Sequence, residues 1–459
     1  MPNFNLLLKS LKGNFKLALP LIAGQLGSVM VMVSDNIMVG QLGITELAAI
    51  SLGIAIFSIF FVVGYGISQG LTPLVAEAFG RGDERSISKF LSNSLLINLI
   101  FAILIVLITE ITIPFLYELG QNKAVVDLAI PYLRLSVVSM IPFMIFLGFK
   151  SFSDGLGRTA IGMNALLMGN ALNIVLNYIF IFGKLGVEEM GVYGAGLSSL
   201  ISRIIMLGFW LLLALNSNRY RPYLIESKIS QIKLSPLIKV LNLGGITAIQ
   251  MFFEVSLFSA STVLMGQFGE LPQAAHQVAL NIVTVSFMLT SAFAIAGTIE
   301  IGKHYGTKDW HKMRYAGSSA MIISVGFMSL AGLILIWGRF FFPQLYIQDE
   351  ATILMAGELL ILAAIFQIPD GLQVAVISAL RGIQDVAWPA FYTFIAYIIL
   401  GLSVAYLFAF EMELGPKGIW IGLIVGLSSS ALLNLRRFWR LSNRAKDQNT
   451  IDLNTLSAQ

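Results

Sequence analysis

Cysteine is absent from the sequence, and charged residues are scarce. Without thiols, disulfides, iron–sulfur clusters and thiolate metal sites are excluded. Only 12% of the 459 residues are charged and 57% are hydrophobic, whereas soluble domains are about one-quarter charged and about half apolar. Lipid is therefore the expected solvent for most of the chain, and we predict an all-α integral membrane protein.

Motifs of ATPases and of several enzyme classes are also missing. No G-x-x-x-x-G-K-[ST] motif occurs, so the chain does not bind ATP through a P-loop. There is no H-E-x-x-H, and His276, His304 and His311 do not form a zinc set. A membrane-embedded transferase would need an aspartate-rich motif such as D-D-x-x-D, which is absent as well. We therefore expect no enzyme activity, no cofactor, no ATP and no nucleic acid, and energy from an ion gradient.

Long apolar stretches dominate what is present. A helix that crosses the hydrocarbon core takes about 20 mostly apolar residues. The stretches of this length lie at approximately 17–39, 47–72, 89–113, 130–150, 160–183, 192–216, 237–265, 274–300, 315–337, 353–380, 388–410 and 417–438. We predict twelve transmembrane helices.

Lysine and arginine are distributed unevenly between the predicted loops. One alternating set of loops, which includes Lys150 and Arg158, carries 23 of them, and the other set carries four. Basic residues mark the cytoplasmic side of membrane proteins. We therefore predict a multi-pass protein of a bacterial inner (plasma) membrane with both termini in the cytoplasm.

The two halves of the sequence repeat each other. Gly40-Gln41-Leu42-Gly43 matches Gly266-Gln267-Phe268-Gly269, and Asp83 falls opposite Asp309 at the same offset. The predicted parts are an N-terminal six-helix lobe at 1–216, a cytoplasmic linker at 217–236, a C-terminal six-helix lobe at 237–440 and a cytoplasmic polar tail at 441–459. Parallel repeats leave a cleft between them, where transporters bind substrate and alternate access.

Three acids lie inside the predicted spans: Asp35, Glu254 and Asp370. Each costs about 2.5 to 3.5 kcal/mol on insertion scales, so it needs a partner or a function. Arg134 and Arg203 are expected near span ends, so no basic partner at the same depth is evident. Such acids can hold Na+ or exchange protons. The alternative is a buried acid that is hydrogen-bonded to a neighbouring helix.

Amides and hydroxyls form stripes on several spans. Asn170, Asn173 and Asn177 share one face of span 5, where their oxygens suit a small cation. Gln277 and Asn281 share a face of span 8, and Tyr65 lies on a similar stripe in span 2. We expect these stripes to line the cleft, although the same side chains also join membrane helices by hydrogen bonds.

Together these features resemble the multidrug and toxic compound extrusion (MATE) family, in its NorM-like bacterial branch. The resemblance covers essentially the whole chain. It rests on Pro20 early in span 1, Asp35-Asn36 followed by Gly40, Glu254 in span 7, Ala274-Ala275-His276-Gln277 at the start of span 8, and Leu380-Arg381-Gly382 with Asp385 and Pro389. It implies two pseudo-symmetric six-helix lobes in a V-shaped arrangement.

The resemblance also implies a function and its residues. The expected activity is multidrug efflux, and hence antibiotic resistance, by antiport of small amphipathic organic cations against Na+ or H+, in a monomer embedded in lipid. The resemblance implies that the coupling cation is bound by Asp35, Asn173, Asn177, Glu254 and Asp370. Among these, the candidates for Na+ ligands are Glu254, Asp370 and Asp35. The resemblance implies substrate binding by Gln277 and Asp349. From the polar stripes we add Tyr65 and Asn281 as substrate-binding candidates, and Phe287 for its aromatic face, where a cation–π contact is possible.

Two points stay open in this interpretation. Phe366 stands where some relatives carry tyrosine beside the C-terminal cation site, so the ligand set there departs from the pattern. The nearest rival function is a flippase for lipids or lipid-linked oligosaccharides from the same superfamily. We expect a strongly basic cavity in such a flippase, whereas the candidate cavity here is acidic.

Overall fold

The computed structural model describes residues 4–118 and 122–456, without the side chains of residues 4, 32, 33, 35–37, 40, 44, 229 and 444–456. The first half contains α1 (Phe4–Gly40), α2 (Ile44–Gln69), α3 (Leu71–Arg81), α4 (Glu84–Thr112), η1 (Ile113–Glu118), α5 (Lys123–Val138), α6 (Met140–Gly155), α7 (Thr159–Phe182) and α8 (Gly191–Leu215). The short α9 (Arg221–Glu226) and η2 (Ile229–Gln231) follow.

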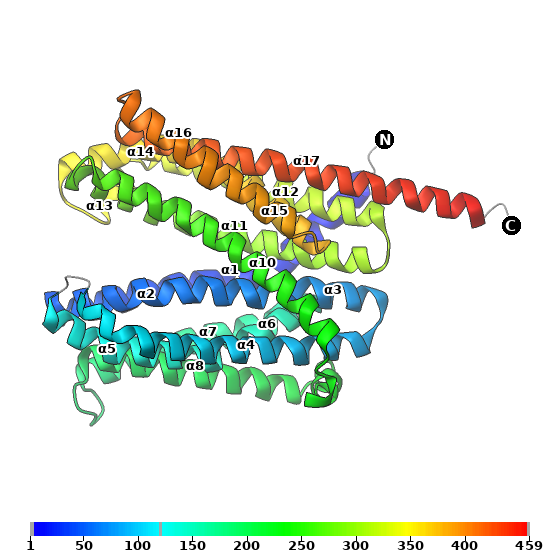
Figure 1. Ribbon diagram of the computed structural model, residues 1–459, viewed down its shortest axis with the longest axis horizontal. Coiled ribbons are helices and arrows are strands. Elements are labelled where there is room, and N and C mark those ends of the chain that lie inside the picture. Colours follow the sequence, from blue (N-terminus) through cyan, green and yellow to red (C-terminus); the bar gives the residue numbers. More distant parts are fainter. Residues whose placement is uncertain (1–3, 119–121, 457–459) are drawn as a thin grey trace. The chain divides into compact units, whose positions relative to one another are not determined.

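The second half continues with helices only, as far as the structure describes it (Figure 1). It contains α10 (Leu234–Gly266), α11 (Glu270–Gly306), α12 (Trp310–Trp337), α13 (Phe341–Gln344), α14 (Glu350–Gly382), α15 (Ala387–Phe394), η3 (Ile395–Gly401), α16 (Leu402–Tyr406), η4 (Leu407–Glu411) and α17 (Pro416–Leu456). η3 and η4 are π-helical, so the eleventh span is wound more loosely than an α-helix.

Within the described residues, twelve helices are long and apolar enough to cross a membrane. The predicted number of spans is therefore confirmed. Span 2 combines α2 and α3, and span 4 combines α5 and α6. Inside lipid a helix satisfies its own backbone hydrogen bonds, which is why apolar segments of this length become helical.

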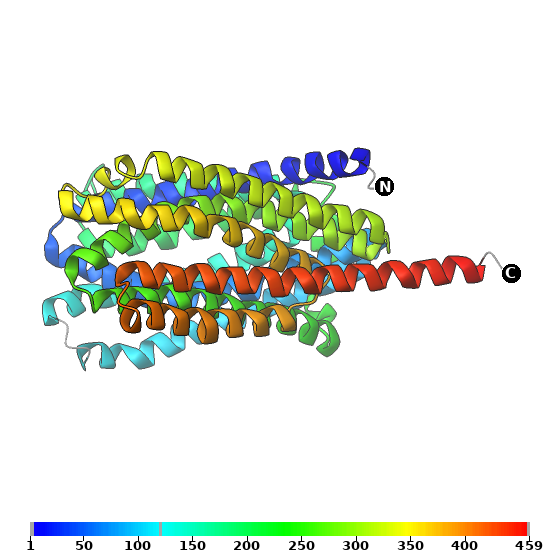
Figure 2. The same ribbon diagram turned by 90° about the horizontal axis from the view of Figure 1, so that it is seen from above.

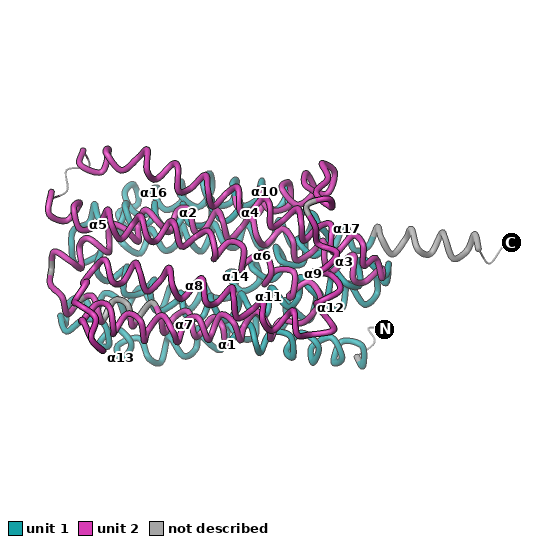
Figure 3. Tube along the Cα trace, turned by 90° about the horizontal axis from the view of Figure 1, so that it is seen from below, with its two compact units in different colours: residues 1–22, 249–459 teal, residues 23–248 magenta. Residues whose placement is uncertain are grey.

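The chain forms two compact units (Figure 3). Unit 1 contains residues 1–22 and 249–459, and unit 2 contains residues 23–248. In unit 2, α4, α6, α7 and α8 pack one against the next (Figure 1). In unit 1, α16 packs beside α17, which in turn packs against α14 (Figure 2).

Both unit boundaries fall inside long helices, α1 and α10. The first half of α1 belongs to unit 1, where the Phe15 ring lies 5.9 Å from the Phe293 ring of α11. The first half of α10 belongs to unit 2, where a Cβ on Gly244 would lie 2.3 Å from the Ile67 carbonyl oxygen. Only glycine allows this approach. The lobe boundaries that we inferred from the repeat stay a prediction. The compact units differ from those lobes because the first half of α1 belongs to unit 1 and the first half of α10 belongs to unit 2.

Matched positions of the repeat have the same local structure. Gly43 and Gly269 both have positive φ, 152° and 106°, and precede α2 and α11. Asp83 and Asp309 cap the N-termini of α4 and α12, each accepting the backbone N–H three residues on, at 3.1 and 3.0 Å. The turns between spans are therefore duplicated along with the spans.

Two basic residues lie deeper than the sequence predicted. Lys150, assigned to a cytoplasmic loop, is buried in α6, and its Nζ lies 2.7 Å from the Asp154 carboxylate. Arg203, expected near a span end, lies in the middle of α8, where its Nη1 donates to the Ser139 hydroxyl at 2.6 Å. Both assignments were wrong because a basic side chain that finds a partner can stay inside a helix bundle.

Candidate functional site

Glu254 and Asp370 come together in unit 1. Glu254 lies on α10 and Asp370 on α14, directly after Pro369. Asp370 is 2% exposed; Glu254 keeps some accessible surface although protein atoms crowd its carboxyl group. The two carboxyl groups interact electrostatically. The structure thus brings together two of the three predicted acids, and their role in coupling stays a prediction.

Neither carboxylate forms an ion pair with lysine or arginine among the residues that the structure describes. Arg381, in the last turn of α14, acts electrostatically on Glu254 without forming an ion pair with it. Two buried acids that share one site repel each other when both are ionised. A bound cation or proton therefore stabilises the pair.

Tyr397 is a member of this site that the sequence analysis missed. It lies in the π-helical η3, is fully buried and interacts electrostatically with both Glu254 and Asp370. Its hydroxyl lies beside Ser430 of α17, outside regular hydrogen-bond geometry. π-Helical turns often occur at functional sites. A lone tyrosine in an apolar span carries no periodic signal, so only the fold reveals it.

Phe366 does not contribute to the polar part of the site. Its ring stands edge-on to Phe258 and to Trp420, at centroid distances of 6.2 and 5.9 Å. It is 2% exposed and belongs to the apolar core of unit 1. The hydroxyl that a tyrosine would bring at this position is therefore absent, and the phenol near the acids is that of Tyr397.

The amides of span 5 form a second polar cluster, in unit 2. Asn177 Nδ2 donates to Asn173 Oδ1 at 3.3 Å. Asn173 Nδ2 lies 3.5 and 3.4 Å from the Ser199 and Ser202 hydroxyls of α8. Asp35 lies on α1, but its side chain is outside the described residues. The predicted meeting of Asp35 with the asparagines therefore stays a prediction.

Four of the five predicted substrate residues lie on two helices, α11 and α2. Gln277 Nε2 donates to Asn281 Oδ1 at 3.1 Å, both exposed on α11, and Phe287 is half-buried further along that helix. Tyr65 lies on α2 of unit 2, stacked on Phe61 at 6.3 Å. The structure therefore brings Gln277 and Asn281 into contact, and their role in binding stays a prediction.

Asp349 is engaged as a helix cap at the start of α14. Its carboxylate accepts hydrogen bonds from the Thr352 backbone N–H at 2.8 Å and from the Thr352 hydroxyl at 2.6 Å. These bonds from Thr352 hold the pKa of Asp349 below its usual range. The exposed carboxylate therefore stays ionised, and it provides a negative charge at this helix end.

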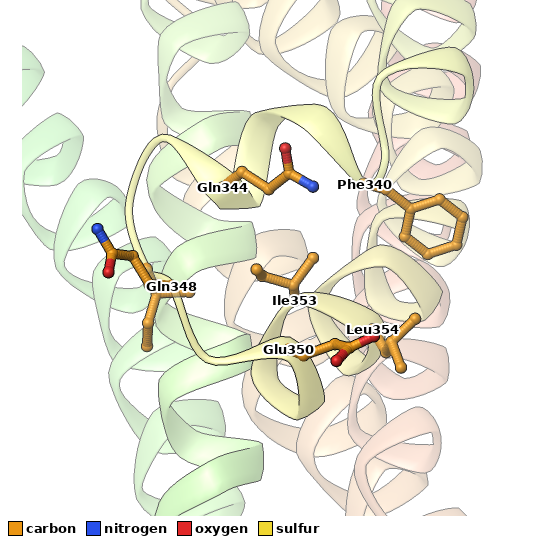
Figure 4. A pocket seen from close by; sticks show the side chains of 7 residues that line it. Phe340, Gln344, Gln348, Glu350, Ile353 and Leu354 are labelled. Carbon is orange, nitrogen blue, oxygen red and sulfur yellow. The ribbon is translucent and has the colours of Figure 1, made fainter.

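A surface pocket of about 450 Å³ lies beside this cap (Figure 4). It is lined by Phe340, Gln344, Ile347, Gln348, Glu350, Ile353 and Leu354, around the loop from α13 to α14. None of the predicted site residues lines it.

The comparison with protein families decides the identity. Residues 20–179 and 247–407 match the MatE family model, once in each half. The chain belongs to the MatE family. This MatE chain is 33% identical over 442 residues to a probable multidrug resistance protein NorM of Rhizobium meliloti (strain 1021), covering 94% of each. It is 29% identical over 437 residues to the multidrug resistance protein NorM of Vibrio cholerae serotype O1, covering 94% of this chain and 96% of the relative.

Solved structures show the fold of this MatE chain. An outward-facing multidrug resistance MATE family transporter of the MOP superfamily matches with a TM-score of 0.87 at 20% identity, over 95% of this chain and 97% of that one. The family resemblance and the all-α, twelve-span fold class are thereby confirmed.

Proposed function

We propose that this MatE chain is a secondary active multidrug efflux transporter that exports small organic cations in exchange for Na+ or H+ by alternating access. Relatives that are 29 to 33% identical are named multidrug resistance protein NorM. One solved neighbour is described as a multidrug resistance MATE family transporter. The observation that carries the coupling part is the pair of Glu254 and the buried Asp370, which has no ion pair with a base among the described residues.

Competition for this pair explains how two positive species are exchanged. A proton, Na+ or an organic cation each relieves the repulsion between the two carboxylates. Binding of one species therefore weakens binding of the other, and this coupling is reciprocal. The ion that enters down its gradient displaces the organic cation, and the reverse exchange resets the site in the other orientation.

The membrane voltage limits the stoichiometry. Moving one charge across 100 mV is worth about 2.3 kcal/mol. One monovalent ion exchanged for one monovalent drug moves no net charge, so only the chemical gradients drive the exchange. Two ions for each drug would add the electrical contribution. Transport that responds to voltage alone would therefore indicate more than one ion per cycle.

We also propose the setting of the molecule. It functions as a monomer in a bacterial inner membrane, in contact with lipid and with both termini in the cytoplasm. Basic residues where spans 8 and 9 join support this orientation: Lys303 in the last turn of α11, Lys308 in the connecting turn and Lys312 in the first turn of α12. Lys150 no longer counts toward the asymmetry because it is buried in α6.

The test is ethidium efflux from proteoliposomes under separately imposed Na+, pH and voltage gradients. Glu254→Gln and Asp370→Asn keep the size of each side chain and remove its charge, so we expect each to reduce ion-driven efflux by at least about tenfold, the loss that accompanies about 1.4 kcal/mol. Glu358→Gln is the matched control, because Glu358 is an exposed acid on the same helix as Asp370 and pairs with Lys417 at 3.0 Å.

The outcomes separate the parts of the proposal. Efflux that is indifferent to all three gradients refutes secondary coupling. Full activity of both acid variants refutes the assignment of the pair while leaving transport intact. Loss of activity in Glu358→Gln to the same degree would point to a general folding defect.

A further inference from the structure

The acidic site of unit 1 is one layer of a deeper polar column. Four helices contribute one oxygen-bearing side chain each to this acidic layer: Glu254 (α10), Asp370 (α14), Tyr397 (η3) and Ser430 (α17). They are connected by the electrostatic contacts of Glu254 with Asp370, of Tyr397 with both acids, and by the proximity of Tyr397 to Ser430.

Each of the four spans to which these elements belong carries a second oxygen-bearing residue one turn away. Gln250 precedes Glu254 by four residues, and Thr393 precedes Tyr397 by four. Gln373 follows Asp370 by three residues, and Asn434 follows Ser430 by four. In the predicted topology spans 7 and 11 run outward, and spans 10 and 12 run inward. All four steps therefore lead toward the cytoplasm, by about 4.5 to 6 Å.

These four residues form the neutral layer, Gln250, Gln373, Thr393 and Asn434, and all are buried. Their exposed fractions are 2%, 1%, 0% and 0%. Gln373 Oε1, Thr393 Oγ1 and Asn434 Oδ1 lack a hydrogen-bond partner among the described residues. Buried polar atoms without a partner are rare because water no longer compensates them. By helical spacing each of these three oxygens lies one turn from a member of the acidic layer, where it is available to a ligand.

The chemistry of the layer selects the ligand. Amide and hydroxyl oxygens are hard donors that suit small cations such as Na+. They do not accept a proton at physiological pH, unlike the carboxylates one turn above. They carry no charge, so a cation is held more weakly than between Glu254 and Asp370.

We propose that Gln373, Thr393 and Asn434, with Gln250, form a second, uncharged station for a dehydrated monovalent cation, on the cytoplasmic side of the acidic layer. The proposal rests on the proposed antiport function, which it deepens by naming the route of the ion. An ion that leaves the carboxylates passes through the neutral layer and reaches the cytoplasm.

Arg381 lies further along this route on α14, and it is 8% exposed. Its positive charge acts electrostatically on Glu254. In the predicted topology, Arg381 lies on the cytoplasmic side of that residue. Because the neutral layer itself carries no charge, the station binds a cation weakly, and we infer that the cation passes through it. The local winding fits this use, because η3 begins two residues after Thr393 and departs from α-helical geometry there.

The test uses the full-length protein in proteoliposomes and compares ethidium efflux driven by Na+ with efflux driven by protons in Na+-free buffer. Thr393→Val and Gln373→Met nearly preserve shape and remove the oxygen. We expect each to slow Na+-driven efflux about tenfold, a typical loss when a group that supports an ion is removed. Proton-driven efflux and equilibrium binding of ²²Na+ should change by less than about twofold.

Controls separate this role from a folding role. Thr393→Ser keeps the hydroxyl and should restore Na+-driven efflux. Thr290→Val is the matched control, because Thr290 is also fully buried in unit 1 but donates to the Ser286 carbonyl of its own helix at 2.9 Å. It should leave both exchanges unchanged.

The results that would overturn the station differ from those that would overturn antiport. Equal slowing of both exchanges assigns the layer to a water chain that relays protons, which contradicts a cation station. Unchanged Na+-driven efflux in both variants, or a wild type driven only by protons, also contradicts it, while the antiport function stands. If neither a Na+ gradient nor a proton gradient drives efflux by the wild-type protein, the antiport function itself is refuted.

Discussion

At the scale of single residues, the pair Lys150 and Asp154 shows how a charge is held inside a bundle of apolar helices. The two residues are one turn apart on α6, and they are 8% and 1% exposed. Lys150 Nζ donates to Asp154 Oδ2 at 2.7 Å, and the second Asp154 oxygen has no hydrogen-bond partner among the described residues. Each charge is tolerated because the other is present.

Breaking this pair should destabilise the protein strongly. Lys150→Met leaves Asp154 as a buried, uncompensated acid, which costs about 3 to 5 kcal/mol. The double variant Lys150→Met with Asp154→Leu removes both charges and should recover most of the loss. Chemical unfolding of the purified protein in detergent measures both effects. Lys417→Met removes a lysine from the exposed pair with Glu358 and should change stability by less than about 1 kcal/mol. A double variant as unstable as the single would contradict this account.

Single residues of the candidate site also differ in how well they could be predicted from the sequence. Glu254 and Asp370 could be predicted because an acid in lipid is costly enough to require a reason. Tyr397, Thr393 and Asn434 could not, since hydroxyls and amides also serve as ordinary helix–helix contacts in membranes. Their significance depends on which helix faces lie together, and this is a property of the tertiary fold.

At the scale of elements, the duplicated turn before α4 and α12 offers an internal comparison. The residue before the cap is Gly82 in the first copy, with φ 72°, and Lys308 in the second, with φ 55°. Both backbones are left-handed, a conformation that costs an ordinary residue about 1 to 2 kcal/mol and glycine little. The second copy therefore carries strain that the first avoids.

We expect Lys308→Gly to stabilise the protein by about 1 kcal/mol and Gly82→Lys to destabilise it by a similar amount. Lys308 is exposed, and nothing lies within 4 Å of a Cβ at Gly82, so packing does not complicate either change. Unfolding by denaturant in detergent, at constant salt, gives both values. Changes of the same sign in the two variants would show that factors other than backbone strain dominate.

Helices were the most predictable elements, since apolar length alone determined the number of spans. Their ends were less predictable. The predicted fourth span stopped at Lys150, whereas the observed span runs from Lys123 to Gly155 and contains the ion pair of Lys150 with Asp154. The exchange of half-helices in α1 and α10 was also not predictable, because glycine contacts such as Gly244 with Ile67 become evident only once the helices cross.

At the scale of the whole molecule, this exchange makes each half of the chain incomplete without the other. Residues 1–22 complete unit 1, where Phe15 meets Phe293 and Gly13 lies against the Glu300 carboxylate. Fragments 1–227 and 228–459, made together in one cell, should therefore associate and co-purify through a tag on either one. A first fragment that begins at Ala23 lacks the exchanged half-helix and should lose most of this association, while a deletion of only residues 1–3 should not. Equal recovery with and without residues 4–22 would show that the exchanged segment does not hold the halves together.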